Sequence, residues 1–193
     1  MKERPILFSA PMVQAILDGR KTMTRRVVKP QPEIITGDIL QPDKWYAANN
    51  GDFAGDPERE LQCPYGQPGD MLWVKETFNR DWCDHVIYKA DGGSAVEAGY
   101  SKEPRWKPSI FMPRQYSRIT LEITAVRVER LQDITEGGAE HEGAERMHLD
   151  DLGQSFMTFK RGFQSLWDSI NEQRGYGWDS NPWVWVIFFQ RIV

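Results

Sequence analysis

The sequence predicts an α+β fold, a small and mostly antiparallel β-barrel with helices packed against it. Segments with the apolar pattern of β-strands dominate the chain and recur along its whole length. Segments with helical spacing lie between these strands at intervals, which is typical of this class. The length of 193 residues suits one domain that buries about 70% of the surface exposed by the unfolded chain.

The first elements are short. The apolar run Ile6-Leu7-Phe8 predicts a strand. A helix follows, with Pro11 in its first turn and Gly19 at its end, and its apolar residues share one face. A basic, β-branched segment over 20–28 then leads into a second strand, which ends before Pro30.

The middle of the chain alternates between strands and irregular stretches. Residues 31–67 are rich in Pro, Gly, Asn and Asp, which predicts a long loop or lid. A turn then introduces a strand over Met71–Phe78, and Val86–Ala90 predicts another. A second irregular stretch follows. We therefore expect a single domain over 1–193, with insertions at about 31–67 and 79–115.

The last third holds the longest predicted elements. Residues 117–131 alternate between apolar and polar side chains and predict a half-buried strand with a bulge near Val126. A helix is expected from an N-cap at Thr135 through Glu142 to Met147. The apolar spacing over 155–172 predicts a second helix. Residues 183–189 are apolar on both faces, which predicts a central strand.

Charge and hydropathy exclude several classes of protein. With 24 basic and 28 acidic residues, the formal net charge is −4, so the chain lacks the positive field of a non-specific nucleic-acid binder. No apolar run approaches the roughly 18 residues that span a bilayer, so we expect no membrane partner. Two cysteines form no disulfide framework, and free thiols suit a reducing cytoplasm, where we expect the protein.

Metal and cofactor sites have no support in the sequence. Cys63, Cys83 and His85 form a loose group of soft ligands whose spacing matches no zinc signature. The glycine pairs at 92–93 and 137–138 lack the flanking residues of a phosphate-binding loop. We therefore expect neither a metal nor an organic cofactor.

The segment Gly19–Arg26 combines a lysine, two threonines and several arginines after a helix end. A threonine hydroxyl becomes a nucleophile when a base takes its proton, and a desolvated lysine can act as that base. Lys21 and Thr24 would point to opposite sides of a straight strand, so they meet only if the chain turns between them. Spacing alone favours the simpler interpretation, in which these are solvated charges and strand-forming threonines.

The run Gly-Arg-Lys-Thr-Met-Thr-Arg-Arg at 19–26 resembles the Gly-x-Lys-Thr-x-Thr-x-Arg signature of ASCH-domain proteins, relatives of the PUA RNA-binding fold. Residues 68–76 resemble the turn and strand of that family, and 123–142 resemble its long strand and following helix. The whole sequence is similar to the longer, prophage-associated members. The resemblance implies a PUA-like fold.

Some small bacterial ASCH proteins are amidohydrolases that remove the acetyl group from N4-acetylcytidine. The resemblance implies that Lys21 and Thr24 are catalytic, and that Glu142 joins them because 134–142 matches the family's Ile-Thr-Glu-x-x-Ala-x-x-Glu run. Thr24 would be the nucleophile, Lys21 its base or an oxyanion stabiliser, and Glu142 the acid for the leaving amine. Glu140 and Glu76 are alternative carboxylates.

Further residues are candidates for substrate binding. Arg25 and Arg26 would contact phosphate if the substrate were RNA, and otherwise they are surface charges. One of Lys75 and Glu76 is expected to face the barrel interior, because neighbours in a strand alternate. Tryptophans in the irregular segments are candidates for base stacking, namely Trp45, Trp82 and Trp106.

Two other functions remain open at this point. A non-catalytic module would recognise RNA or a nucleoside in the same cleft, and a nuclease would cut single-stranded RNA. The net charge of −4 favours a small substrate over an RNA chain. The expected partner is therefore a modified pyrimidine nucleoside or RNA.

Overall fold

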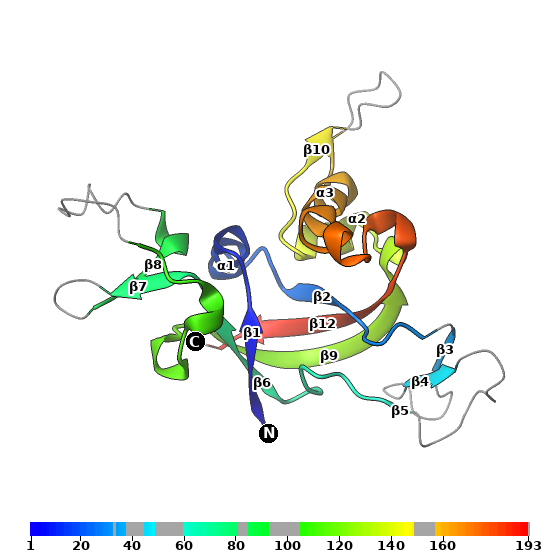
Figure 1. Cartoon of the computed structure of the whole chain (residues 1–193), viewed down its shortest axis with the longest axis horizontal. Helices are drawn as coiled ribbons and strands as arrows, with labels where there is room; N and C mark the ends of the chain where they lie inside the picture. The colour runs from blue at the N-terminus through cyan, green and yellow to red at the C-terminus, as the bar shows by residue number, and fades with distance from the viewer. Residues whose placement is uncertain are drawn as a thin grey trace.

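The computed structural model contains an open, curved sheet (Figure 1), and helices pack against both of its faces. Trp82 and Cys83, two residues named above, lie outside the part of the chain that the structure describes. No helix in that part is long and apolar enough to cross a membrane. The described residues are 1–32, 34–37, 45–48, 60–80, 85–92, 105–148 and 157–192.

The central sheet has five strands in the order β1-β6-β9-β12-β2. Only the β1–β6 pair is parallel, so the α+β class and the mostly antiparallel sheet are confirmed. Within the described chain no ladder joins the edge strands β1 and β2. The strands are β1 (Glu3–Leu7), β6 (Met71–Lys75), β9 (Thr120–Arg130), β12 (Trp183–Arg191) and β2 (Met23–Val27).

Each face of the sheet carries its own apolar core. Helix α1 (Ala10–Leu17) covers one face, and α2 (Glu136–His141) and α3 (Phe159–Asn171) cover the other. Strand β12 contributes to both cores, with Val184 and Val186 on the side of α2 and α3 and Trp185 and Ile187 on the side of α1. This double burial explains why the strand is apolar on both faces.

Both C-terminal helices are shorter than predicted. Helix α2 begins after Thr135, whose hydroxyl accepts a 3.0 Å hydrogen bond from the Gly138 N–H, and it ends before Glu142. Predicted helical residues beyond these ends instead form a hairpin of β10 (Met147–His148) and β11 (Met157–Thr158). Strand pairing over these short segments therefore replaces the helical turns that their spacing suggested.

Two strands also depart from the prediction. The bulge in β9 falls at Thr124, because Phe188 pairs with Ala125 while Phe189 pairs with Ile123. The strand predicted over 71–78 ends at Lys75, and a separate pair follows, formed by β7 (Phe78–Arg80) and β8 (Val86–Tyr88).

The first insertion contains a small sheet of its own rather than only a loop. Strands β3 (Ile34–Gly37), β4 (Trp45–Ala48) and β5 (Glu60–Leu61) pair antiparallel in that order. Their shortness and the surrounding Pro and Gly residues hide the period-two pattern. The short 3-10 turns are η2 (Lys89–Asp91), η3 (Ser109–Phe111), η4 (Arg114–Tyr116), η5 (Leu131–Asp133), η7 (Glu172–Arg174) and η8 (Trp178–Ser180).

Candidate active site

The first motif lies between the end of α1 and the edge strand β2. Gly19 adopts a φ of 74°, a left-handed conformation that suits glycine and ends the helix. The Lys21 N–H then donates to the Ala15 carbonyl, and the Thr22 N–H donates to the His141 carbonyl, each at 2.9 Å. Lys21 therefore precedes the strand, in a turn that α1 and α2 hold from both sides.

Lys21 and Glu142 form a buried ion pair. The Lys21 Nζ lies 2.7 Å from Glu142 Oε2 and 2.6 Å from the Glu142 carbonyl oxygen, and it donates to both. The exposed fractions of the two residues are 3% and 4%. Burial lowers the pKa of the Lys21 ammonium group, Glu142 opposes this effect, and the positive charges of Arg26 and Arg25 add to it.

Gly143 permits the close approach of Lys21 to the end of α2. Its φ of 78° is left-handed, and a Cβ atom there would lie 2.8 Å from the Ala15 Cβ and 3.2 Å from the Lys21 Cβ. A side chain at this position would therefore push apart the segments that carry Lys21 and Glu142.

Thr24 lies in β2 opposite Ile187, on the face that α1 covers. It is 2% exposed. Lys21 Nζ and Arg26 Cζ lie 5.5 Å and 5.1 Å from the centre of the Phe8 ring, so Phe8 adjoins the cations that precede and follow Thr24. Lys21 itself lies before β2 begins at Met23, so the alternation of a straight strand does not govern its side chain.

Arg25 lies on the opposite face of β2 from Thr24, and Arg26 bridges the two edge strands. Arg25 is 6% exposed and forms 3.3 Å ion pairs with both Glu142 Oε1 and Glu129 Oε2. Arg26 donates from Nη2 to the Leu7 carbonyl of β1 at 2.8 Å. Both predicted phosphate-binding arginines therefore already have partners within the protein.

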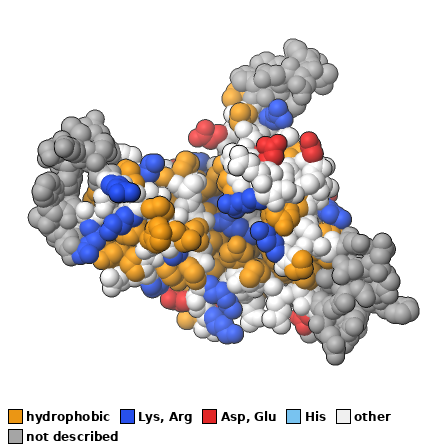
Figure 2. Space-filling view, in the orientation of Figure 1, with side chains coloured by type: hydrophobic (Ala, Val, Ile, Leu, Met, Phe, Trp, Pro, Cys, Tyr) orange, Lys and Arg blue, Asp and Glu red, His pale blue; other side chains and the backbone are white. Residues whose placement is uncertain are grey.

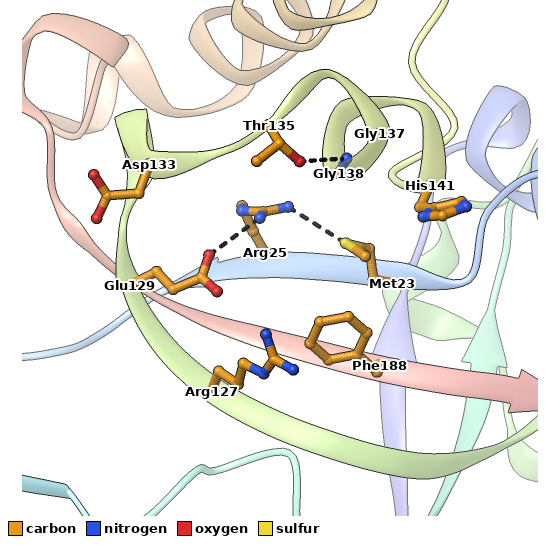
Figure 3. A pocket seen from close by; sticks show the side chains of 10 residues that line it. All are labelled: Met23, Arg25, Arg127, Glu129, Asp133, Thr135, Gly137, Gly138, His141 and Phe188. Atoms are coloured by element: carbon orange, nitrogen blue, oxygen red, sulfur yellow. Dashed lines mark hydrogen bonds and ion pairs between the residues drawn. The ribbon is translucent and has the colours of Figure 1, made fainter. Parts of the chain in front are cut away.

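A pocket of about 570 Å³ opens on the Arg25 face of β2 (Figure 3). Arg25 extends into it from β2, and the Glu129 and Arg127 side chains approach from β9. Its described lining does not include Lys21, Thr24 or Glu142. The lining residues are Met23, Arg25, Arg127, Glu129, Asp133, Thr135, Gly137, Gly138, His141 and Phe188.

The alternative carboxylate Glu76 belongs to a different ion-pair group. It is buried and accepts two 3.0 Å hydrogen bonds from Arg118, which also pairs with Asp91. Burial raises the pKa of the Glu76 carboxyl against the opposing effect of Arg118. Its neighbour Lys75 donates to the Ile110 carbonyl and lies over the Trp73 ring. The structure thus places Lys75 and Glu76 with the second insertion.

The two described stacking candidates are both half-buried. Trp45 packs against the core on the α1 face, and its indole N–H has no partner among the described residues. Trp106 precedes Lys107, which pairs with Phe78. The exposed carboxylate Glu140 lies in α2, whereas the buried Glu142 reaches Lys21.

Sequence reasoning missed two contributors to this site, Phe8 and Glu129. Phe8 appears only as a strand residue in the sequence, and Glu129 only as a polar position on the long strand. No spacing rule connects them with the first motif, because they reach it through sheet pairing. The described residues also contain no group of three or more His, Cys, Asp or Glu side chains arranged to hold a metal ion.

No family model and no curated protein matches this chain. Two solved structures are similar to it. The ASCH domain of Lactobacillus crispatus has a TM-score of 0.43 at 11% identity, with 98% of this chain and 79% of that chain covered. A protein of Enterococcus faecalis has a TM-score of 0.44 at 10% identity, with 100% and 81% covered. The likeness is distant, so the function must be argued from the chain's own residues.

Proposed function

We propose that this protein is an amidohydrolase that removes the acyl group from N4-acetylcytidine-type nucleosides. The observation that carries the proposal is the buried Lys21–Glu142 pair, whose lysine lies three residues before the buried Thr24 in the same motif. A base, an acid and a nucleophile are the three groups that amide cleavage needs. The resemblance implies the same three residues, Lys21 and Thr24 through the first motif and Glu142 through the 134–142 run, and it supplies the substrate class.

In the first step the Thr24 Oγ1 attacks the carbonyl carbon of the acetyl group. Neutral Lys21 takes the hydroxyl proton, and the lowered pKa of Lys21 favours the neutral amine that this step needs. The carbonyl π bond becomes the oxyanion of a tetrahedral intermediate. The ammonium that Lys21 becomes in this step and the guanidinium of Arg26 both lie near Phe8, and their positive charges would stabilise the oxyanion.

Collapse of the intermediate breaks the bond between the carbonyl carbon and N4. Glu142, protonated from the ammonium of Lys21, delivers this proton to the leaving nitrogen, and cytidine departs. The acetyl group is then an ester on Thr24. Water attacks that ester and Lys21 takes one of its protons. Lys21 returns this proton to the Thr24 oxygen as the ester bond breaks, and the acetic acid formed releases its remaining proton to solvent as acetate. Atoms and charges balance over the two steps without a metal or an organic cofactor.

The decisive experiment incubates the purified protein with N4-acetylcytidine and follows cytidine by chromatography. We expect turnover in the wild type and a loss of at least about a hundredfold in Thr24→Val, which keeps the shape and removes the hydroxyl. Thr22→Val is the matched control, because Thr22 is exposed and two residues away. Absence of conversion by the wild type, or full turnover in Thr24→Val, would overturn the proposal.

A second candidate function, a non-catalytic RNA-binding module, is favoured by one surface. Figure 2 shows apolar and basic side chains gathered over the green segments of Figure 1. Phe111 is 71% exposed, and Lys75 and Lys107 lie 5.5 Å and 6.0 Å from the Trp73 and Phe78 rings. Phe78 is buried, so Phe111 is the exposed ring of this group, and an exposed ring near cations suits the stacking of single-stranded bases.

This second candidate predicts an RNA affinity that falls steeply with salt, whereas hydrolysis of a neutral nucleoside is insensitive to salt. Phe111→Ala would weaken RNA binding, and Ile170→Ala, an exposed apolar residue on α3, is the control. Cleavage of the RNA during the same incubation would instead indicate the nuclease. Equal RNA affinity in Phe111→Ala and Ile170→Ala would exclude the surface around Phe111 as the RNA-binding site.

A further inference from the structure

We propose that the pocket on the Arg25 face of β2 is a separate recognition site for a guanine base. It lies on the face of the edge strand opposite Thr24, and Lys21, Thr24 and Glu142 are absent from its described lining (Figure 3). Its volume of about 570 Å³ is within the range of small-molecule sites and is ample for a nucleoside. The proposal is independent of the hydrolase activity.

The charges around the pocket favour a neutral ligand. Two guanidinium groups, Arg25 and Arg127, face two carboxylates, Glu129 and Asp133, so the formal charges of these four residues cancel. A polyanion would be repelled by the carboxylates, and a cation by the arginines. A neutral ligand with both donors and acceptors on its edge satisfies both pairs.

The arginines provide unused donors. The Nε of the buried Arg25 has no hydrogen-bond partner among the described residues, although both Nη atoms have carboxylate contacts. This atom is itself buried, so the donors that a ligand in the pocket can reach are those of Arg127. Arg127 is exposed and has no carboxylate partner within the described chain; its Cζ lies 5.1 Å from the centre of the Phe188 ring.

The carboxylates provide acceptors on the neighbouring side. Glu129 uses Oε2 for Arg25, which leaves Oε1 for another donor. Asp133, in η5, is exposed and has no ion pair among the described residues. Figure 3 shows the Asp133 and Glu129 side chains on the same side of the Arg25 side chain. A ligand in the pocket therefore meets donors and acceptors side by side.

Guanine is the base whose edges match this arrangement. Its 2-amino group and the adjacent ring N–H are neighbouring donors, which a carboxylate accepts together. Its carbonyl oxygen and the neighbouring ring nitrogen are acceptors, which a guanidinium group engages in a bidentate pair. Arg127 is the guanidinium that can make this pair, since both Nη atoms of Arg25 already contact carboxylates. Adenine, cytosine and uracil lack two adjacent donors beside two adjacent acceptors.

Titration calorimetry with four nucleosides tests the proposal on the wild-type protein. We expect guanosine to bind, and both inosine, which lacks the 2-amino group, and 7-deazaguanosine, which lacks the acceptor ring nitrogen, to bind at least about tenfold more weakly. Cytidine is the negative control, because its base lacks two adjacent donors beside two adjacent acceptors. Absence of guanosine binding, or equal binding of all four nucleosides, would overturn the proposal.

Two variants assign the recognition to the pocket. Arg127→Ala should weaken guanosine binding at least about tenfold and remove the penalty for 7-deazaguanosine. Arg146→Ala, an exposed arginine over Phe159 and outside the pocket, should bind as the wild type. Asp133→Asn should reduce the preference for guanosine over inosine. Unchanged binding in Arg127→Ala and Asp133→Asn would place guanosine elsewhere. Guanosine has no acyl group, so this result does not depend on turnover.

Discussion

One ammonium group, the Nζ of Lys21, donates to both the side chain and the backbone carbonyl of Glu142, at 2.7 Å and 2.6 Å. The residue after the helix α2 is therefore tied to the turn before β2 through two bonds that water does not reach. Such a pair has two consequences. In the proposed reaction it holds the proton for the leaving amine, and in the folded protein the removal of either partner leaves the other charge buried without its closest counter-charge.

Lys21→Met should reduce the free energy of unfolding by about 3–5 kcal/mol, because it leaves the Glu142 carboxylate buried without its closest cation. Chemical denaturation followed by circular dichroism measures the change. Lys29→Met, at an exposed lysine, is the control. A second substitution, Glu142→Leu, should restore much of the loss in the double variant. A double variant less stable than Lys21→Met would contradict this account.

The pH dependence of turnover should report Lys21. The base acts in its neutral form, so kcat/KM should rise with pH through the lowered pKa of Lys21, below its usual range of about 10.4. The charge of Arg26 lowers this pKa, so Arg26→Gln should raise it and move the rising limb to higher pH. Arg146→Gln should leave the limb in place. An identical limb in Arg26→Gln and the wild type would exclude Lys21 as the titrating base.

Gly143→Ala should lower the free energy of unfolding by more than the positive φ angle alone would cost. Gly143 and Gly92 have φ values of 78° and 76°, but a Cβ at Gly143 would meet Ala15 at 2.8 Å, while one at Gly92 meets nothing within 4 Å. Gly92→Ala therefore measures the cost of the φ angle, about 1–3 kcal/mol. Thermal unfolding of both variants tests the difference. Equal losses of stability in the two variants would mean that the Cβ contact with Ala15 and Lys21 adds nothing to the cost of the φ angle.

The stability of the protein in mild acid should depend on Glu76. Burial raises its pKa in the folded state, so between the unfolded value of about 4.3 and the raised value the folded protein binds more protons. The free energy of unfolding therefore falls as pH rises through this window. Glu76→Gln should remove that part of the fall, and Glu140→Gln, at an exposed carboxylate, should keep it. Parallel curves for the wild type and Glu76→Gln would contradict the raised pKa.

Apolar patterns predict the strands best where burial is complete. Residues 183–189 lie in β12, between β9 and β2, as their continuous apolar character indicates. The ends of helices were predicted less well. The helix expected through Met147 stops before Glu142, because Gly143 takes a left-handed φ and the following chain pairs as β10 with β11. Helical spacing does not contain that pairing, which is a tertiary effect.

The sequence by itself determined the α+β class, the central strand and the turn at Gly19 that places Lys21 before β2. It also named Lys21 and Glu142, by resemblance, without a way to test whether they meet. Only the tertiary structure decided that they touch across 121 positions of the chain, and that Arg25 and Arg26 lie on opposite faces with different partners. The physical reason is that a period of two assigns alternating faces to neighbouring residues, while helices and strands from distant parts of the chain decide what each face meets.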